Sequence, residues 1–380
     1  MIKKIPYLFA VMTLLSSCGG GTPLSDSTSK EPIKVTDMIG REVTIDVKGD
    51  YRVVCLGAGA LRLYSYVGNL DLLCGVEDID NPEKSFMWQS TSRPYFDAYK
   101  DKFKNLPSCG LGGPNAQAPE FEKILECRPN IIISEFEDVA IANDIQEKVG
   151  VPVVTLKYGK QTVFDPLVEQ SIELLGTIFH TTDRSKALVS YIDAARTDLG
   201  NRTKDVKEED KPSLYLGCLG NYGVQDIYMS CVNYPIFKAS NIKNVLDDKG
   251  LNPGFQKMDK EFLTTLDADK IILDASGISV FKTTYEEDKE FFDNLKAFKN
   301  NEVYLQMPYN AYYTNLETAL MDAYFDASVA YPKQFKDLDM ENKYNEILET
   351  FVGKRCYDEV KAKPASYGGF QKIDFTTFFD

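Results

Sequence analysis

The stretch from Asp183 to Val206, DRSKALVSYIDAARTDLGNRTKDV, contains no strand-like run and keeps its apolar residues at helical spacing. Asp183 stands where it can cap a helix, and leucine, isoleucine, alanine and tyrosine follow at that spacing. At about 1.5 Å per residue such a helix is roughly 30 Å or more long, the span of a small domain. The preceding region, 164–179, also lacks a strand-like run. The sequence therefore predicts linking helices over 161–206, the second of them long enough to join two lobes.

Segments on both sides of this helix alternate between strand-like and helix-like patterns. The predicted strands are 52–56, 72–76, 130–134, 151–156, 213–218, 270–274 and 302–305. Such alternation is typical of mostly parallel sheets covered by helices. The chain has 380 residues, more than one core usually holds. We expect an α/β fold with two Rossmann-like lobes, 33–160 and 207–360, and a C-terminal tail, 361–380.

The two predicted lobes share a helix-to-strand unit. Glu122 lies seven residues before Pro129, and Glu261 lies seven residues before Ala268. In both places an apolar run follows the turn and predicts a strand. This echo indicates approximate two-fold symmetry between the lobes.

Composition and charge exclude several classes of protein. The chain carries 43 Lys+Arg against 57 Asp+Glu, a net charge of −14, and 43% hydrophobic residues. A nucleic-acid-binding protein needs a basic face, so no nucleic-acid partner is expected. The only histidine is His180, which leaves little material for a histidine metal cage or a Ser-His-Asp triad.

The first eighteen residues predict export and lipid anchoring. Lys3 and Lys4 precede an apolar segment, 5–15, that is too short to span a bilayer. It ends in Leu-Ser-Ser-Cys18, the pattern of a bacterial lipoprotein. We expect a signal peptide over 1–17 and acyl chains on Cys18 that hold the protein at a membrane, on the periplasmic side or at the cell surface. Residues 18–32 are rich in Gly, Ser, Thr and Pro and predict a flexible tether.

The remaining seven cysteines are an odd number, contain no Cys-x-x-Cys motif and sit mostly in apolar runs. They are typical of small buried hydrophobes. Export permits one structural disulfide, and the sequence leaves that alternative open.

The sequence resembles a known family at several points. The segment 35–43, VTDMIGREV, followed by the run 52–57, RVVCLG, and the helix–Pro–Asn–Ile unit at 122–133 are similar to the cluster-A, or class III, periplasmic binding proteins. These are substrate-binding lipoproteins of ABC importers for iron–siderophores, haem and vitamin B12. The long linking helix is the family's architectural mark, and the resemblance covers about 33–360.

The resemblance implies a ligand cleft between the lobes and a partner, an ABC permease with its ATPase subunits. It also implies that one acidic residue per lobe pairs with permease arginines, and by position these are Glu122 and Glu261. Both begin a helix, where a carboxylate is favoured and can accept a bidentate arginine contact. We expect a monomer with no intrinsic cofactor. We also expect no enzymatic activity, because no phosphate-binding or dinucleotide-binding loop is complete in the sequence.

Loops that follow the strands should line the cleft, and they are dense in arginine and aromatic residues. The expected ligand-binding residues are Arg62, Trp88, Arg93, Tyr95, Tyr222, Tyr309, Tyr312 and Tyr313. Arginines can clamp anionic oxygens and aromatic rings can cover a flat chelate. The sequence therefore predicts an anionic ferric chelate, siderophore-like, with no metal held directly by the protein.

Other ligands stay open. Haem, cobalamin or an oxyanion such as molybdate would suit the same fold, and a ferric site of tyrosines and carboxylates remains an alternative. Six of the expected residues also have a structural interpretation, as a salt-bridge partner, a loop brace, a lobe-interface contact or a core residue: Arg62, Trp88, Arg93, Tyr309, Tyr312 and Tyr313. An alternative function outside this family is that of a surface lipoprotein that binds a glycan or a partner protein.

Overall fold

The computed structural model describes residues 31–84, 90–113, 118–160 and 162–379. The first elements are β1 (Ile33–Thr36), β2 (Glu42–Ile45), β3 (Val53–Leu56), α1 (Ala60–Val67), α2 (Pro94–Phe103), α3 (Phe121–Cys127), β4 (Ile131–Ser134), α4 (Val139–Val149), β5 (Val153–Thr155), α5 (Pro166–Ile178) and α6 (Thr182–Thr203). The later elements are β6 (Ser213–Gly217), β7 (Met229–Val232), α7 (Pro235–Ala239), β8 (Lys243–Asn244), β9 (Gly254–Lys257), α8 (Lys260–Thr264), β10 (Lys270–Asp274), α9 (Ile278–Glu287), α10 (Lys289–Asn294), α11 (Lys296–Lys299), β11 (Val303–Gln306), α12 (Leu316–Ala330), α13 (Met340–Val352), α14 (Tyr357–Lys361) and β12 (Gln371–Lys372).

Each half of the chain builds a parallel sheet. The first sheet has the order β3-β4-β5, and its strands are buried along their whole length. The second has the order β12-β11-β10-β6-β8, in which only β12 runs antiparallel to its neighbour. Runs of valine, isoleucine and leucine form these strands because helices cover both faces of a parallel sheet. The predicted two-lobe α/β fold is confirmed.

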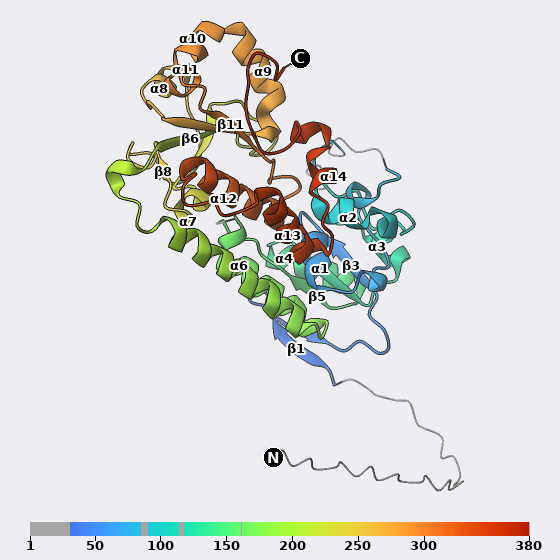
Figure 1. Ribbon diagram of the computed structural model, residues 1–380. Helices are drawn as coiled ribbons and strands as arrows, with labels where there is room; N and C mark the ends of the chain where they lie inside the picture. Colours follow the sequence, from blue (N-terminus) through green and yellow to red (C-terminus); the bar gives the residue numbers. More distant parts are fainter. Residues whose placement is uncertain (1–30, 85–89, 114–117, 161, 380) are drawn as a thin grey trace, which may run out of the picture. The chain divides into compact units, whose positions relative to one another are not determined.

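The long helix α6 joins the two halves, as the sequence predicts (Figure 1). It packs on α5 and α1 near its beginning and on α7 of the second half. Its buried side chains, among them Leu188, Ile192 and Leu199, recur at helical spacing and face the core.

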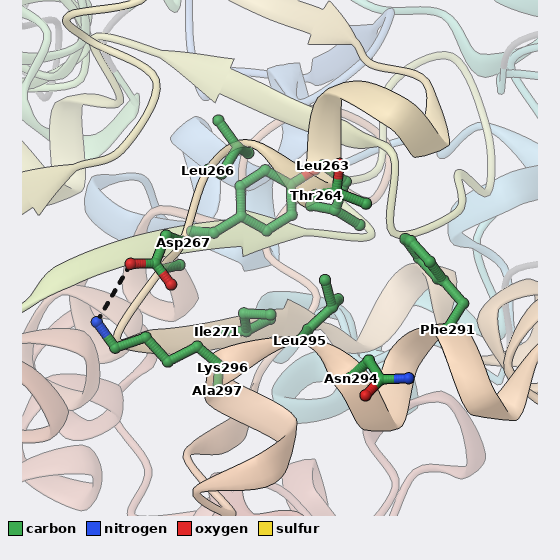
Figure 2. A pocket seen from close by; sticks show the side chains of 12 residues that line it. Leu263, Thr264, Leu266, Asp267, Ile271, Phe291, Asn294, Leu295, Lys296 and Ala297 are labelled. Atoms are coloured by element: carbon green, nitrogen blue, oxygen red, sulfur yellow. Dashed lines mark ion pairs between the residues drawn. The ribbon is translucent and has the colours of Figure 1, made fainter.

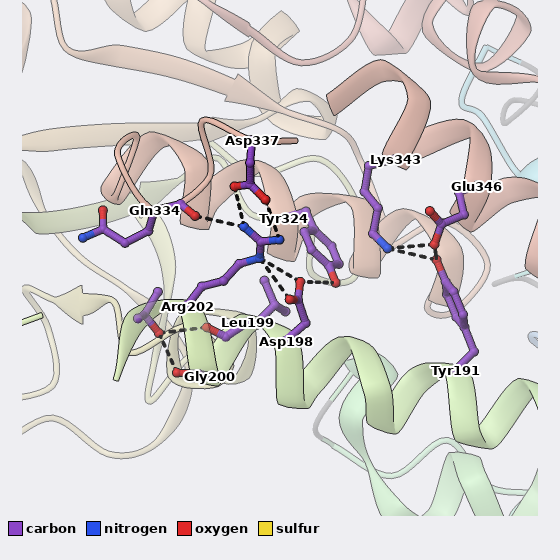
Figure 3. Close-up of polar contacts among 11 residues, drawn as sticks. Tyr191, Asp198, Leu199, Gly200, Arg202, Tyr324, Gln334, Asp337, Lys343 and Glu346 are labelled. Atoms are coloured by element: carbon purple, nitrogen blue, oxygen red, sulfur yellow. Dashed lines mark hydrogen bonds and ion pairs between the residues drawn. The ribbon is translucent and has the colours of Figure 1, made fainter. Parts of the chain in front are cut away.

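Polar contacts fasten α6 to the helices that follow the second sheet (Figure 3). Arg202 bonds to Asp198 one turn earlier and to Asp337 at 2.8 Å. The Tyr324 hydroxyl of α12 donates to Asp198 at 3.1 Å. Glu346 of α13 accepts from the Tyr191 hydroxyl at 2.8 Å. The linking helix is therefore held along its length and not only at its ends.

The chain returns to the first half after leaving the second sheet. Helix α13 packs against α1 and α2, and α14 packs against α2. The Tyr99 hydroxyl on α2 donates to the carbonyl of Val352 at 2.6 Å. One hydrophobic cluster accordingly includes β3, α6, β6, α12 and α13. The halves are therefore joined by the packing of α13 and α14 as well as by α6.

The predicted strand at 72–76 is wrong. Cys74 donates to Val53, whereas Val76 bonds to Pro107 and Cys109, so successive residues pair with different neighbours. Gly75 lies where an added Cβ would be 2.4 Å from the Cys127 sulfur. The close approach keeps this segment irregular and leaves it only isolated bridges to the sheet.

The C-terminal residues add to the second sheet. The strand β12 pairs with β11, and three phenylalanines after it pack on the second hydrophobic cluster. The ring of Phe375 stacks on Tyr285 at 4.8 Å and on Phe298 at 5.0 Å. The tail thus covers an aromatic surface of α9 and α11.

All seven cysteines in the described part of the chain are buried free thiols, so none of them forms a disulfide. No described helix is both long enough and apolar enough to cross a membrane.

Candidate ligand cleft

The candidate site is built at the carboxyl ends of β3, β4 and β5, where a parallel sheet presents its loops. Gly57 follows β3, Glu135 follows β4, and Tyr158 follows β5 after a short turn. Gly59 has φ +86°, and an added Cβ would lie 2.5 Å from the Tyr158 hydroxyl oxygen. Glycine is therefore required where the loop after β3 passes Tyr158.

A loop from the second half meets this edge. It connects β11 to α12, and its tyrosines Tyr312 and Tyr313 both adopt positive φ, at 52° and 69°. Bulky residues rarely adopt that conformation, and strain of this kind is found at functional sites. Hydrogen bonds between Ala311 and Tyr313 and between Asn315 and Tyr309 hold the loop in shape.

Arg62 of α1 fastens this loop to the first half. Its guanidinium donates to the Asn315 side chain at 3.1 Å, to the carbonyl of Ala311 at 2.7 Å and to the Tyr158 hydroxyl at 3.3 Å. The Arg62 side chain is completely buried. In this structure, then, Arg62 positions the loop and is not open to a ligand.

A second cross-link joins Tyr312 to Glu77. The Tyr312 hydroxyl donates to Glu77 at 2.6 Å, and the backbone N–H of Gly57 donates to the other oxygen at 3.0 Å. Burial raises the pKa of Glu77 to about 7, against the effect of both hydrogen bonds. The carboxyl group therefore gains its charge near neutral pH while it ties the loop to β3.

Arg93 and Tyr95 form a buried brace with the segment around Asp80. Arg93 donates to Asp80 at 2.7 Å and to the carbonyl of Ile79 at 2.8 Å, and the Tyr95 hydroxyl donates to Asp80 at 2.5 Å. All of these polar groups are buried. A ligand would reach Arg62 or Arg93 only if their present partners were displaced, so their direct role in binding stays a prediction.

The remaining predicted residues are divided between core and surface. Tyr309 is buried, Tyr313 is partly exposed, and Tyr222 is fully exposed. The rings of Tyr313 and Tyr158 lie 4.5 Å apart at a tilt of 42°. Trp88 and Cys18 lie outside the described residues.

Glu135 is the residue of this edge that sequence analysis did not single out as a ligand contact. Its side chain is only 8% exposed, and its Oε1 has no hydrogen-bond partner in the described structure. Burial, with the charge of Glu137 beside it, raises the pKa of Glu135 to about 9. Its signal in the sequence is its place, directly after the buried strand 131–134.

The two predicted docking residues occupy equivalent places. Glu122 is in the first turn of α3 and Glu261 in the first turn of α8, and both are exposed. Neither has an ion-pair partner within the described ranges. Both carboxylates are therefore open to a cationic group.

A pocket of about 350 Å³ lies elsewhere, between α8, α10 and α11 of the second half (Figure 2). Leu263, Leu295 and Phe291 form part of its wall, and Lys296 pairs with Asp267 at 3.5 Å on one side. It is far in the fold from the ends of β3, β4 and β5, so we do not assign the ligand to it. The described residues contain no cluster of three or more His, Cys, Asp or Glu that could hold a metal ion.

Comparison with known proteins gives consistent results. The family model described as periplasmic binding protein matches residues 89–308, more than half of the chain. A periplasmic solute-binding protein from Veillonella parvula is 19% identical with a TM-score of 0.68, covering 88% of this chain and 96% of that one. The molybdate periplasmic binding protein MolA of Haemophilus influenzae, bound to molybdate, is 17% identical with a TM-score of 0.64, covering 85% and 98%.

A third similar structure is the Helicobacter pylori protein CeuE with Ni(II) bound. It is 14% identical with a TM-score of 0.57, and the alignment covers 84% of this chain and 96% of that one. No match was found among the curated protein sequences.

Proposed function

Because the chain belongs to the family of periplasmic binding proteins, which bind solutes for ABC importers and are not enzymes, we propose that it captures a ferric chelate of the siderophore type. The chelate binds at the ends of β3, β4 and β5, beneath the loop that connects β11 to α12, and is delivered to a membrane permease.

One observation carries this proposal: the strained loop with Tyr312 and Tyr313 is tied across the fold onto the strand ends by Arg62 and Glu77. Phenol and carboxylate groups gather there, at Tyr158, Tyr313 and Glu135. Aromatic rings suit the flat surface of a chelate, and oxygen-rich groups suit its polar rim. That two similar structures hold molybdate and Ni(II) supports a metal-containing ligand here.

The proposal is tested by equilibrium titration with ferric siderophores, haem, cobalamin and molybdate. We expect saturable binding of at least one ferric siderophore at micromolar concentration or below, about −8 kcal/mol or stronger. Tight binding of cobalamin, haem or molybdate, with no response to any ferric siderophore, would assign the cleft to that ligand and reject the chelate.

Glu122 and Glu261 are proposed to contact the permease. Replacing both by alanine should leave the affinity for the chelate unchanged, because both side chains are exposed and lie on α3 and α8. Uptake of the iron-55-labelled chelate through the cognate permease should fall at least tenfold, since each lost charged contact costs about 1.5–3 kcal/mol. The matched control replaces Glu126 and Glu290, two other exposed helix carboxylates. Normal uptake by the Glu122/Glu261 double variant contradicts the assignment.

Lipid anchoring is proposed for Cys18, with the mature protein held at a bacterial membrane by acyl chains. The intact mass of protein extracted from membranes tests this proposal. A mass that begins at Cys18 with added acyl chains supports it, and an unmodified N-terminus contradicts it.

A further inference from the structure

The carboxyl group of Glu135 lacks a partner where the fold would be expected to supply one. The side chain is only 8% exposed, yet Oε1 accepts no hydrogen bond in the described structure. Leaving a buried acceptor without a donor is energetically unfavourable. A donor group that arrives from outside the protein would recover this free energy.

The cationic groups near Glu135 are committed elsewhere. The three guanidinium nitrogens of Arg62 each donate to another acceptor. Lys157 pairs with the exposed carboxylate of Glu137 at 3.5 Å. The missing donor is therefore not provided by either neighbouring cation.

Tyr313 lies close enough to Glu135 for their charges to interact, and Tyr222 lies close enough to Tyr313 to do the same. Tyr313 is partly exposed and Tyr222 is fully exposed. The faces of aromatic rings attract cations. The net charge of −14 also favours the approach of a positively charged molecule over an anion.

We propose that Glu135 determines the specificity of the cleft by accepting a hydrogen bond from an ammonium group carried by the ferric chelate. The inference rests on the proposed function and specifies its ligand class. It reverses the charge expected from the sequence, because the two arginines that favoured an anion are engaged within the protein.

Binding of an ammonium group should release a proton from the protein. Burial and Glu137 raise the pKa of Glu135 to about 9, while Arg62 and Lys157 oppose the shift. The empty protein therefore holds Glu135 as the neutral acid at a pH of about 7.5. When the ammonium group arrives, the carboxyl O–H bond breaks, the proton leaves to solvent, and a carboxylate–ammonium pair remains. The other titratable groups nearby, Tyr158 and Tyr313, stay protonated because their pKa values are raised above the usual range.

The experiment compares two probes that differ only in this group. Ferrioxamine B is a ferric hydroxamate with a free ammonium, and its N-acetylated form carries a neutral amide in the same place. Wild-type protein should bind ferrioxamine B roughly ten- to a hundredfold more tightly than the N-acetylated form. This difference in affinity corresponds to one charged hydrogen bond. Calorimetry at a pH of about 7.5 in two buffers of different ionisation enthalpy should show release of about one proton, in line with the raised pKa.

Glu135→Gln should remove both signatures. The glutamine side chain has nearly the shape of the protonated acid, so we expect the two probes to bind within about twofold of each other, with no proton released. Glu147→Gln is the control, because that carboxylate is exposed on α4 and is not among the groups that shift the pKa of Glu135. It should keep the preference and the proton release.

The outcomes separate the two proposals. Equal binding of both probes by wild type, or binding without proton release, overturns the ammonium inference and leaves the ferric-chelate function standing. If wild type binds neither probe and also fails to bind ferric enterobactin, a triply anionic chelate, the proposed function is overturned together with the inference. Preference for ferric enterobactin alone overturns only the inference. The wild-type comparison needs no variant, so a folding defect in Glu135→Gln cannot obscure the result.

Discussion

Replacing Arg62 by alanine is expected to lower the free energy of unfolding by about 3–5 kcal/mol, the largest effect we expect from a single substitution in this protein. The substitution removes the donors to Asn315, Ala311 and Tyr158 and leaves a cavity where a fully buried side chain was. The loop between β11 and α12 loses a side-chain tie to the first half, while the contact between Tyr312 and Glu77 remains. Urea denaturation followed by far-ultraviolet circular dichroism measures the change.

Two further variants show why Arg62 matters. Arg62→Lys keeps the charge but loses the planar fork, so an intermediate loss is expected. Arg355→Ala is the surface control, because that side chain is exposed and pairs with Glu349 and Asn342 at the surface. It should cost less than about 1 kcal/mol. If Arg62→Ala is as stable as wild type yet no longer binds a chelate, Arg62 is a ligand contact and the positioning role described above is wrong.

Stability is expected to fall as the pH rises from about 5 to about 9. Burial raises the pKa of Glu135 to about 9, of Glu77 to about 7 and of Asp274 to about 6. Between the pKa of each group in the unfolded chain, near 4, and its raised value in the fold, the folded protein holds the extra proton. Each such group therefore costs on the order of 1.4 kcal/mol per pH unit across its own window, and the loss ends above its folded pKa.

Denaturation midpoints at fixed pH values between about 5 and about 9 test this expectation. Glu135→Gln should flatten the upper part of the curve, between about pH 7 and 9, because only Glu135 among the three titrates that high. Below about pH 7 the slope should become smaller but remain, because Glu77 and Asp274 still contribute there. A stability that is constant or rises over this range contradicts the burial of uncharged carboxyl groups.

The elements that the sequence predicted well are those with long, regular patterns. The strand 270–274 has the predicted bounds, and the linking helix α6 begins and ends within a few residues of the expected ones. The bounds of both elements follow from the local pattern of apolar residues, which can be read directly from the sequence. The segment 72–76 failed because its apolar run is broken up by close packing at Gly75, and packing against distant residues leaves no local signal.

The partners of the predicted site residues could not be predicted from the sequence. Arg62 lies on α1, directly after β3, whereas Arg93 precedes α2 and does not directly follow a described strand of the sheet. Their guanidinium groups donate to Asn315, Ala311 and Asp80, which are distant or unremarkable in the sequence. Glu135 became a candidate only when its unpartnered oxygen could be seen. Whether a charged side chain faces a ligand or a protein partner depends on tertiary contacts, and no spacing rule encodes them.

The most direct measurement of the central claim is native mass spectrometry, with iron analysis, of the protein purified from its own host. We expect one iron atom per chain and a mass increase equal to one organic chelate that dissociates as an intact complex. A chain that carries cobalamin, a glycan or a bare metal ion, with no iron chelate, would contradict it.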